Sequence, residues 1–141
     1  MDPKYNKFIA CWLANSIDLL FDSDDNLLYP VPFGEYQVGD YIDSDEFDNF
    51  QKSYKQYIVE HNMKIIQQGL SVVDGIIHIY NCVFTMDNKY YKVPLETEEG
   101  SIYEENLKPN RQSWLYNDIE KCEVYPKTVT TTIYVSKNDE I

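Results

Sequence analysis

Apolar positions near the N-terminus repeat with the period of an amphipathic helix. Asp2 can cap such a helix, and Pro3 suits its first turn. A stripe of apolar residues then follows a 3.6-residue period as far as Leu20. The polar sequence DSDDN begins two residues later. We expect a helix over residues 3–21.

A second helical pattern begins after the Pro- and Gly-containing connection at 27–42. Asp43, with Glu46 three positions later, resembles a capping box in which aspartate is the cap. Aromatic and aliphatic residues keep helical spacing from there to Gly69, which can end a helix. The second expected helix covers 43–69.

The rest of the chain alternates as β-strands do. Strands are expected near 75–85 and 89–95, joined in a hairpin, and a second pair near 121–125 and 128–135. The stretch between these pairs, 96–119, reads as a long loop with one short element near its end. About four strands in sequence order predict an antiparallel meander.

These elements predict an α+β fold in which two amphipathic N-terminal helices pack on a C-terminal antiparallel sheet of about four strands. A chain of this length is expected to form a single domain, residues 1–141. Along 76–84 both faces of the expected strand are largely apolar. A central strand covered on both sides, or a sheet that lines a homo-oligomer interface, would account for that pattern.

Composition places the chain among cytoplasmic globular proteins. Hydrophobic residues make up 43% and aromatic residues 15%, which is enough to form a core. Cys11, Cys82 and Cys122 lie far apart without metal-ligand spacing, so we expect reduced thiols and no disulfide, metal or cofactor. The longest apolar run, residues 8–14, is too short to cross a membrane.

Charge changes the picture more than composition does. The formal net charge is −12, from 12 basic and 24 acidic residues, which argues against direct binding to nucleic acid. No basic residue lies between Lys7 and Lys52, yet that stretch holds ten acids, and a second base-free stretch at 93–107 holds five. Local salt bridges therefore cannot explain these acids. The ten acids are Asp18, Asp22, Asp24, Asp25, Glu35, Asp40, Asp43, Asp45, Glu46 and Asp48.

No catalytic or metal motif stands out. The sequence DSDDN opens like a calcium loop, but Leu27 replaces the required glycine and Phe33 the bidentate glutamate, so a solvated helix end is the favoured interpretation. No nucleophile elbow, zinc-protease motif, P-loop or dinucleotide fingerprint occurs. We therefore expect a protein that is not an enzyme.

Aromatic residues interleaved with acids form the most informative pattern. The simpler interpretation is that the rings face the core and the acids face water. The absence of any positive charge across this stretch favours a second interpretation, a surface shaped for a basic partner. Charges of a single sign repel each other and lower stability, so a chain that needed only solubility would usually mix both signs. The expected contact residues are Tyr36, Asp40, Tyr41, Asp43, Asp45, Glu46 and Asp48.

Two functions remain as hypotheses. The first is an inhibitor or immunity-type protein that mimics nucleic acid and docks on a basic, nucleic-acid-binding protein; the composition is typical of an AT-rich phage or mobile element. The alternative is an oligomeric small-ligand-binding protein with an aromatic pocket, for which Arg111 and Trp114 are the expected ligand contacts.

Overall fold

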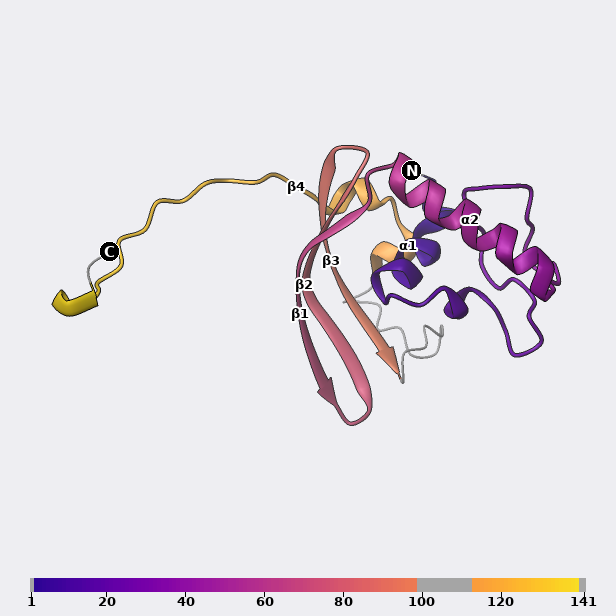
Figure 1. Cartoon of the computed structure of the whole chain (residues 1–141), viewed down its shortest axis with the longest axis horizontal. Coiled ribbons are helices and arrows are strands. Elements are labelled where there is room, and N and C mark those ends of the chain that lie inside the picture. The colour runs from indigo at the N-terminus through magenta and orange to yellow at the C-terminus, as the bar shows by residue number, and fades with distance from the viewer. Residues whose placement is uncertain (1, 99–112, 140–141) are drawn as a thin grey trace.

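The structure, a computed structural model, describes residues 2–98 and 113–139 and has helices on one side of an antiparallel sheet (Figure 1). The predicted α+β class is thus confirmed. The N-terminal elements are η1 (Pro3–Tyr5), α1 (Asn6–Leu13), η2 (Ile17–Leu20) and α2 (Ser44–Glu60). The C-terminal elements are β1 (Lys64–Val73), β2 (Ile76–Met86), β3 (Lys89–Glu98), η4 (Ser113–Tyr116), η5 (Ile119–Cys122), β4 (Glu123–Val124) and η6 (Lys137–Asp139).

The first helix is shorter than the predicted range 3–21. Asp2 caps a 3-10 turn by accepting a hydrogen bond from the backbone N–H of Lys4, and α1 then ends at Leu13. Asn15 adopts a left-handed conformation with φ of 56°, which asparagine tolerates better than most residues and which breaks the helix. The apolar period continues past the break because η2 buries Leu20 in the same core.

The second helix begins where predicted but ends nine residues early. Asp43 Oδ1 accepts a hydrogen bond from the backbone N–H of Glu46 at 2.8 Å, so the expected cap is confirmed. Beyond Glu60, Asn62 takes a φ of 50° and turns the chain into β1. The predicted helix over 43–69 is therefore wrong in its last turns.

The sheet has the order β1-β2-β3-β4, and every neighbouring pair is antiparallel. The predicted hairpin at 75–85 and 89–95 is confirmed as β2 and β3. Asp74 and Gly75, both with positive φ, form the tight turn between β1 and β2. This strand pair was not predicted.

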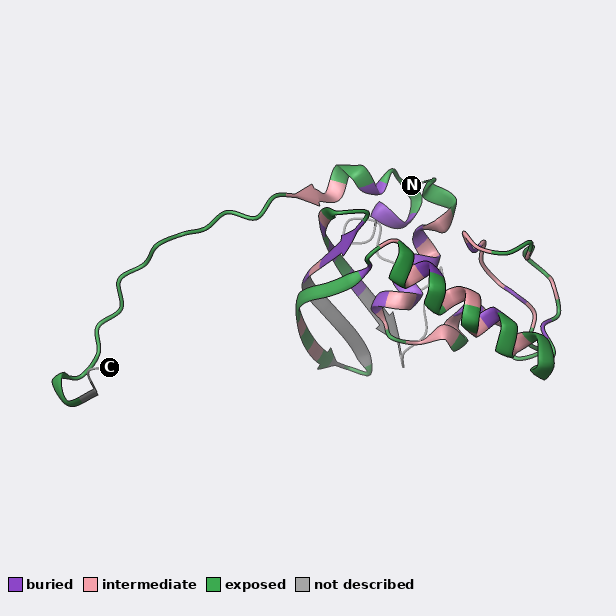
Figure 2. Cartoon of the chain, turned by 45° about the horizontal axis from the view of Figure 1, so that its top comes forward, coloured by how far each residue is buried: buried purple, intermediate pink, exposed green. Residues whose placement is uncertain are grey.

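The predicted pairing of 121–125 with 128–135 is wrong. Only Glu123 and Val124 form a strand, and they pair with β3 at Tyr91 and Tyr90. Since β3 begins at Lys89, this strand offers no partner beyond position 125. Figures 1 and 2 show the following residues running away from the body of the molecule as an extended, exposed tail.

The core is built from a cluster of aromatic rings that joins α1, the 21–42 segment and α2. Phe8 of α1 is fully buried and meets three rings edge to face, with centroid distances of 5.6 to 5.8 Å. Trp12 on the same helix meets Phe84 of β2 at 5.8 Å, so α1 lies between the sheet and α2. We call the rings on the helical side the aromatic cluster: Phe8, Phe21, Phe33, Tyr36, Phe47, Phe50, Tyr54 and Tyr57.

One buried polar side chain fastens the C-terminal half to α1. Asn6 is fully buried, and its Nδ2 donates hydrogen bonds to the carbonyl oxygens of Trp114 and Asn117 at 2.7 and 2.6 Å. Trp114 Nε1 in turn donates to the carbonyl oxygen of Pro94 at 2.8 Å. The segment after the sheet is thereby held against both α1 and β3.

Replacement of Phe8 tests the role of the aromatic cluster. We expect Phe8→Ala to lower the free energy of unfolding by about 3–5 kcal/mol, because it removes a buried ring and leaves a cavity. Urea unfolding followed by circular dichroism measures this change. Val59→Ala on α2, where the side chain is 77% exposed, is the control and should stay within about 0.5 kcal/mol of wild type. A loss below about 1 kcal/mol for Phe8→Ala would contradict the assignment.

Candidate functional site

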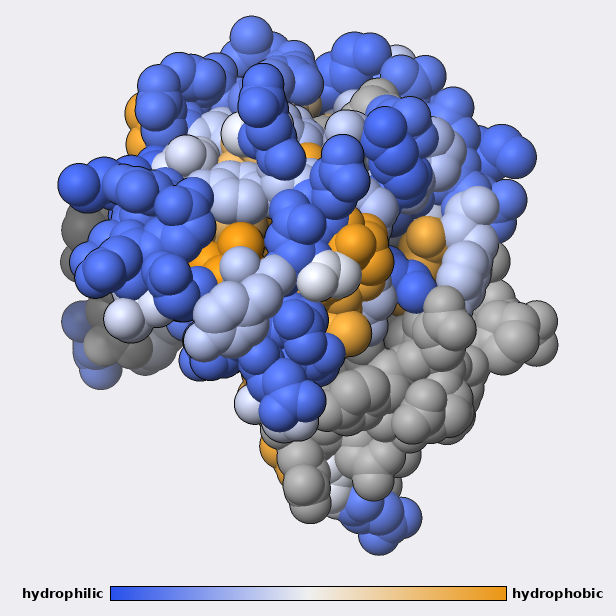
Figure 3. Space-filling model, turned by 90° about the vertical axis from the view of Figure 1, so that its right-hand side faces the viewer, coloured by the Kyte–Doolittle hydropathy of each residue, from blue (hydrophilic) through white to orange (hydrophobic). Residues whose placement is uncertain are grey.

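Five aspartates surround a groove at the end of the molecule where α2 begins. The groove has a volume of about 550 Å³, and its walls come from η2, the turn that follows it and the first turns of α2. Figure 3 faces this end, where the surface is mostly hydrophilic with smaller apolar patches in its hollows. We call this feature the acidic groove; its lining residues are Asp18, Phe21, Asp22, Ser23, Asp25, Ile42, Asp43, Ser44, Phe47 and Asp48.

The turn after η2 is shaped by its own aspartate. Asp22 Oδ1 accepts hydrogen bonds from the backbone N–H groups of Asp24 and Asn26, both at 2.9 Å. These bonds, the one from Asn26 first, lower the pKa of Asp22 because they stabilise its ionised form. The N–H of Ile42 donates to the carbonyl oxygen of Asp25 at 3.0 Å, which holds the turn against the residues just before α2.

The other wall of the groove is the start of α2. One carboxylate oxygen of Asp43 accepts the hydrogen bond that caps α2. The Asp48 carboxylate accepts no hydrogen bond from the described residues. Phe47 packs against Phe21 with ring centroids 5.7 Å apart, and Phe50 against Phe21 at 5.0 Å. Contacts between rings beneath the surface therefore bring the two acidic segments together.

Within the described part of the chain, ion pairs join Lys4 to Asp2 and Lys89 to Glu123, and His61 Nδ1 lies 2.7 Å from Asp87 Oδ1; all three contacts are away from the groove. None of the residues that line the groove is basic. The groove carboxylates consequently form no ion pair with the described residues, although Lys52 lies one helical turn after Asp48 on α2.

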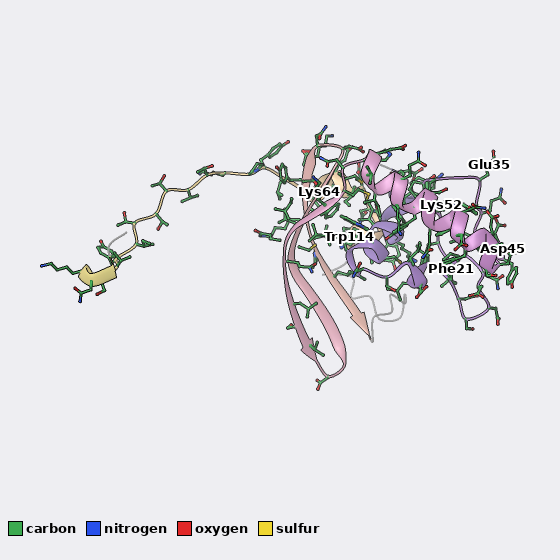
Figure 4. The ribbon with its side chains drawn as sticks, in the orientation of Figure 1. Phe21, Glu35, Asp45, Lys52, Lys64 and Trp114 are labelled. Atoms are coloured by element: carbon green, nitrogen blue, oxygen red, sulfur yellow. The ribbon has the colours of Figure 1, made fainter. Side chains whose placement is uncertain are left out.

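The residues expected to contact a partner divide between the groove and its surroundings. Asp43 and Asp48 line the groove itself. Asp45 is exposed at the start of α2 (Figure 4). Asp40 accepts a hydrogen bond from the backbone N–H of Gln37 at 2.8 Å, which closes the turn before α2.

The two expected tyrosines differ in their surroundings. Tyr41 is 65% exposed and lies beside the groove turn, since it forms a β-bridge with Asn26. Tyr36 is half-buried in the aromatic cluster, and its hydroxyl donates to Glu46 Oε1 at 2.9 Å. Burial first and that hydrogen bond second raise the pKa of Tyr36. Tyr41 is the ring that remains accessible.

Three of the five groove aspartates were not among the contact residues expected from the sequence: Asp18, Asp22 and Asp25. All three belong to the base-free stretch, so the charge pattern contained them. Their convergence with α2 depends on the left-handed residue Asp25, φ 62°, and on ring packing across separate segments. Neither feature has a local sequence signal that marks the groove.

The ligand contacts expected under the alternative function are not brought together in the described structure. Trp114 is buried, with its Nε1 hydrogen-bonded to Pro94, and packs in the core. Arg111 lies outside the described residues. So do Glu99, Glu104 and Glu105 and the side chains of Glu96 and Glu98, which formed the second expected acidic zone.

Metal and thiol chemistry have no visible site in the ranges 2–98 and 113–139. No three His, Cys, Asp or Glu side chains there are arranged to hold a metal ion. The three cysteines are free thiols, and burial raises the pKa of Cys11 to about 12 and of Cys82 to about 11. These two groups are therefore neutral and poorly nucleophilic near pH 7.

Comparison with protein-family models, with curated proteins and with solved structures finds no significant match to the chain. Its function is therefore inferred from geometry and charge alone. Within the described residues, no helix has both the length and the apolar character needed to cross a membrane.

The lowered pKa of Asp22 predicts a pH dependence of stability. A carboxyl whose pKa is lower in the folded state stabilises the fold above its unfolded pKa of about 3.9, and this stabilisation disappears as pH falls through the folded value. Acid unfolding curves should therefore show that Asp22→Asn loses less stability than wild type below about pH 4.

Asp24→Asn is the control for that experiment, since it removes the same charge from the same turn without touching an acceptor of these hydrogen bonds. It should retain the acid-dependent loss seen in wild type. Identical acid profiles for wild type and Asp22→Asn would show that the hydrogen bonds to Asp22 do not stabilise the turn.

Proposed function

We propose that this chain is a non-enzymatic interaction protein whose acidic groove, with the adjoining start of α2, docks on a basic surface of a nucleic-acid-handling protein. The observation that carries the proposal is the convergence of five aspartates from two separate segments on one hollow without a basic residue. The exposed Asp45 and Tyr41 extend the same surface.

The groove has chemistry suited to Lys and Arg side chains. The side chains of Asp18, Asp25 and Asp48 accept no hydrogen bond from the described residues, so their oxygens are available to ammonium and guanidinium groups. Phe21 and Phe47 line the same hollow, where they can cover the aliphatic stems of such side chains. Both parts of a long basic side chain thus find a complementary surface.

Nucleic-acid mimicry follows from the way such charges act at a distance. A protein that binds DNA or RNA carries clustered Lys and Arg that attract phosphate groups. Carboxylates grouped without counter-charges produce a field of the same sign and steer association in the same way. An inhibitor or immunity-type protein, encoded by a phage or other mobile element and acting in the cytoplasm, would use such a surface.

The alternative, a small-ligand-binding oligomer, has a second hollow of about 550 Å³ beside α1, but neither of the expected ligand contacts is among its described lining residues. The burial of Trp114 and its hydrogen bond to Pro94 place that side chain in the core.

A competition experiment with isosteric variants tests the proposed function. Asp18→Asn, Asp25→Asn and Asp48→Asn together neutralise groove carboxylates while keeping side-chain shape. The probes are a bacterial RNA polymerase core, a non-specific nuclease and a DNA-packaging protein, each bound to a fluorescent duplex of about 20 base pairs in about 50 mM salt. We expect wild type to displace the duplex from at least one probe, and the variant to do so at least about tenfold less well.

The matched control carries Glu35→Gln, Asp74→Asn and Glu120→Gln, which remove the same total charge from exposed sites outside the groove. It should compete within about twofold of wild type. Lysozyme, a basic protein that does not handle nucleic acid, controls for unspecific attraction. Failure of wild type to displace duplex from any probe, or equal weakening in both variants, would refute the proposal.

A further inference from the structure

The C-terminal tail is an extended segment that packs on nothing in the described structure. Every residue from Tyr125 to Asn138 is exposed, and Figure 2 shows the tail as a continuous exposed strand of chain far from the helices and the sheet. The exposed residues of the tail include large apolar side chains: Ile133 is 75% exposed and Tyr134 is 95% exposed. Exposed apolar side chains of this kind are unfavourable in water and are typical of an interaction surface.

The tail has the sequence of a β-strand. Seven of the eight residues at 128–135 are β-branched and the eighth is a tyrosine, which are the residue types that favour strands. In an extended chain Val129, Ile133 and Val135 share one side. The range 125–137 holds no acid in a chain whose net charge is −12, so the tail can approach another copy without like-charge repulsion.

The sheet offers the tail an open edge. β1 stands first in the strand order and has β2 as its single neighbour among the described strands. Register shifts interrupt its pairing between Ile65 and Gly69, whereas Gly69–Val73 pairs regularly with β2. Leu70 and Val72 lie in this regular part and are 58% and 62% exposed. Unpaired backbone beside exposed apolar side chains is what an added strand requires.

Residues 128–135 cannot all pair with that edge in their own chain. Val124 lies in the same row of the sheet as Lys64, at the opposite edge, about 14 Å away across three strand spacings. Gly69 lies five residues further along β1, about 17 Å from Lys64 in the strand direction. The four Cα steps from Val124 to Thr128 span at most about 14 Å, whereas a strand added outside β1 lies four strand spacings, about 19 Å, from β4, so the whole of 128–135 cannot be laid along its own β1.

We propose that residues 128–135 add as a strand to the free edge of β1 in a second copy of this chain. The same exchange in the opposite direction makes a two-fold symmetric dimer, with both tails docked. The apolar side of the tail covers the exposed side chains of Leu70 and Val72. This dimer uses the sheet edge and leaves the acidic groove free, so it stands or falls independently of the proposed function.

Sedimentation equilibrium of the full chain from about 1 to 200 µM tests the exchange. Wild type should shift with concentration towards twice the 16.7 kDa mass of one chain. Thr130→Pro with Thr131→Pro should raise the dimer dissociation constant at least about tenfold, because proline removes a strand donor whichever edge the tail presents. The prolines lie in exposed tail, so the unfolding midpoint of the monomer should not change.

Thr130→Val with Thr131→Val is the matched control, because it keeps the β-branched shape, and should dimerise like wild type. Leu70→Lys with Val72→Lys changes the receiving edge at exposed positions and should raise the dimer dissociation constant at least about tenfold, as the prolines do. A wild type that stays monomeric overturns the proposal. So does a dimer that survives the prolines, or one that is lost with the prolines and kept with the lysines, which would place the tail elsewhere.

Discussion

Edge-to-face contacts between aromatic rings are the interaction on which the rest of the structure depends. Phe33 meets Phe8 at 5.8 Å and Phe50 at 5.1 Å, so a segment with little regular secondary structure is held between two helices. Each such contact adds about 0.5–1.5 kcal/mol to the burial of the rings. With eight rings in the aromatic cluster, this part of the fold has a large apolar anchor for a small chain.

That anchor makes the acidic groove possible. Phe21, Phe47 and Phe50 lie directly beneath the aspartates, and their packing brings η2 and α2 together although both carry negative charge. Like charges in one hollow oppose folding, and mixed charges on the same scaffold would not. The proposed attraction of a basic partner would use this field.

Local signals could be predicted from the sequence, and features that need a distant partner could not. The cap at Asp43 and the β2–β3 hairpin follow from residues close in sequence, which is why both were found. The sequence predicts helix for residues 64–69 of β1 because Ile65 also fits a 3.6-residue period, and the irregular pairing of this part hides strand alternation. Residues 128–135 have a strand's composition but no neighbour to pair with in this chain.

Asp18, Asp25 and Asp48 should oppose the fold that holds them, because they lie among like charges in the groove. The measurement that tests this claim most directly is the free energy of unfolding in low salt for Asp18→Asn/Asp25→Asn/Asp48→Asn and for the equally charged control Glu35→Gln/Asp74→Asn/Glu120→Gln. Clustered repulsion predicts that the groove variant gains more stability than the control, and that the difference shrinks at about 0.5 M salt because charges are screened. Equal stability of the two variants, or a less stable groove variant, would contradict the claim.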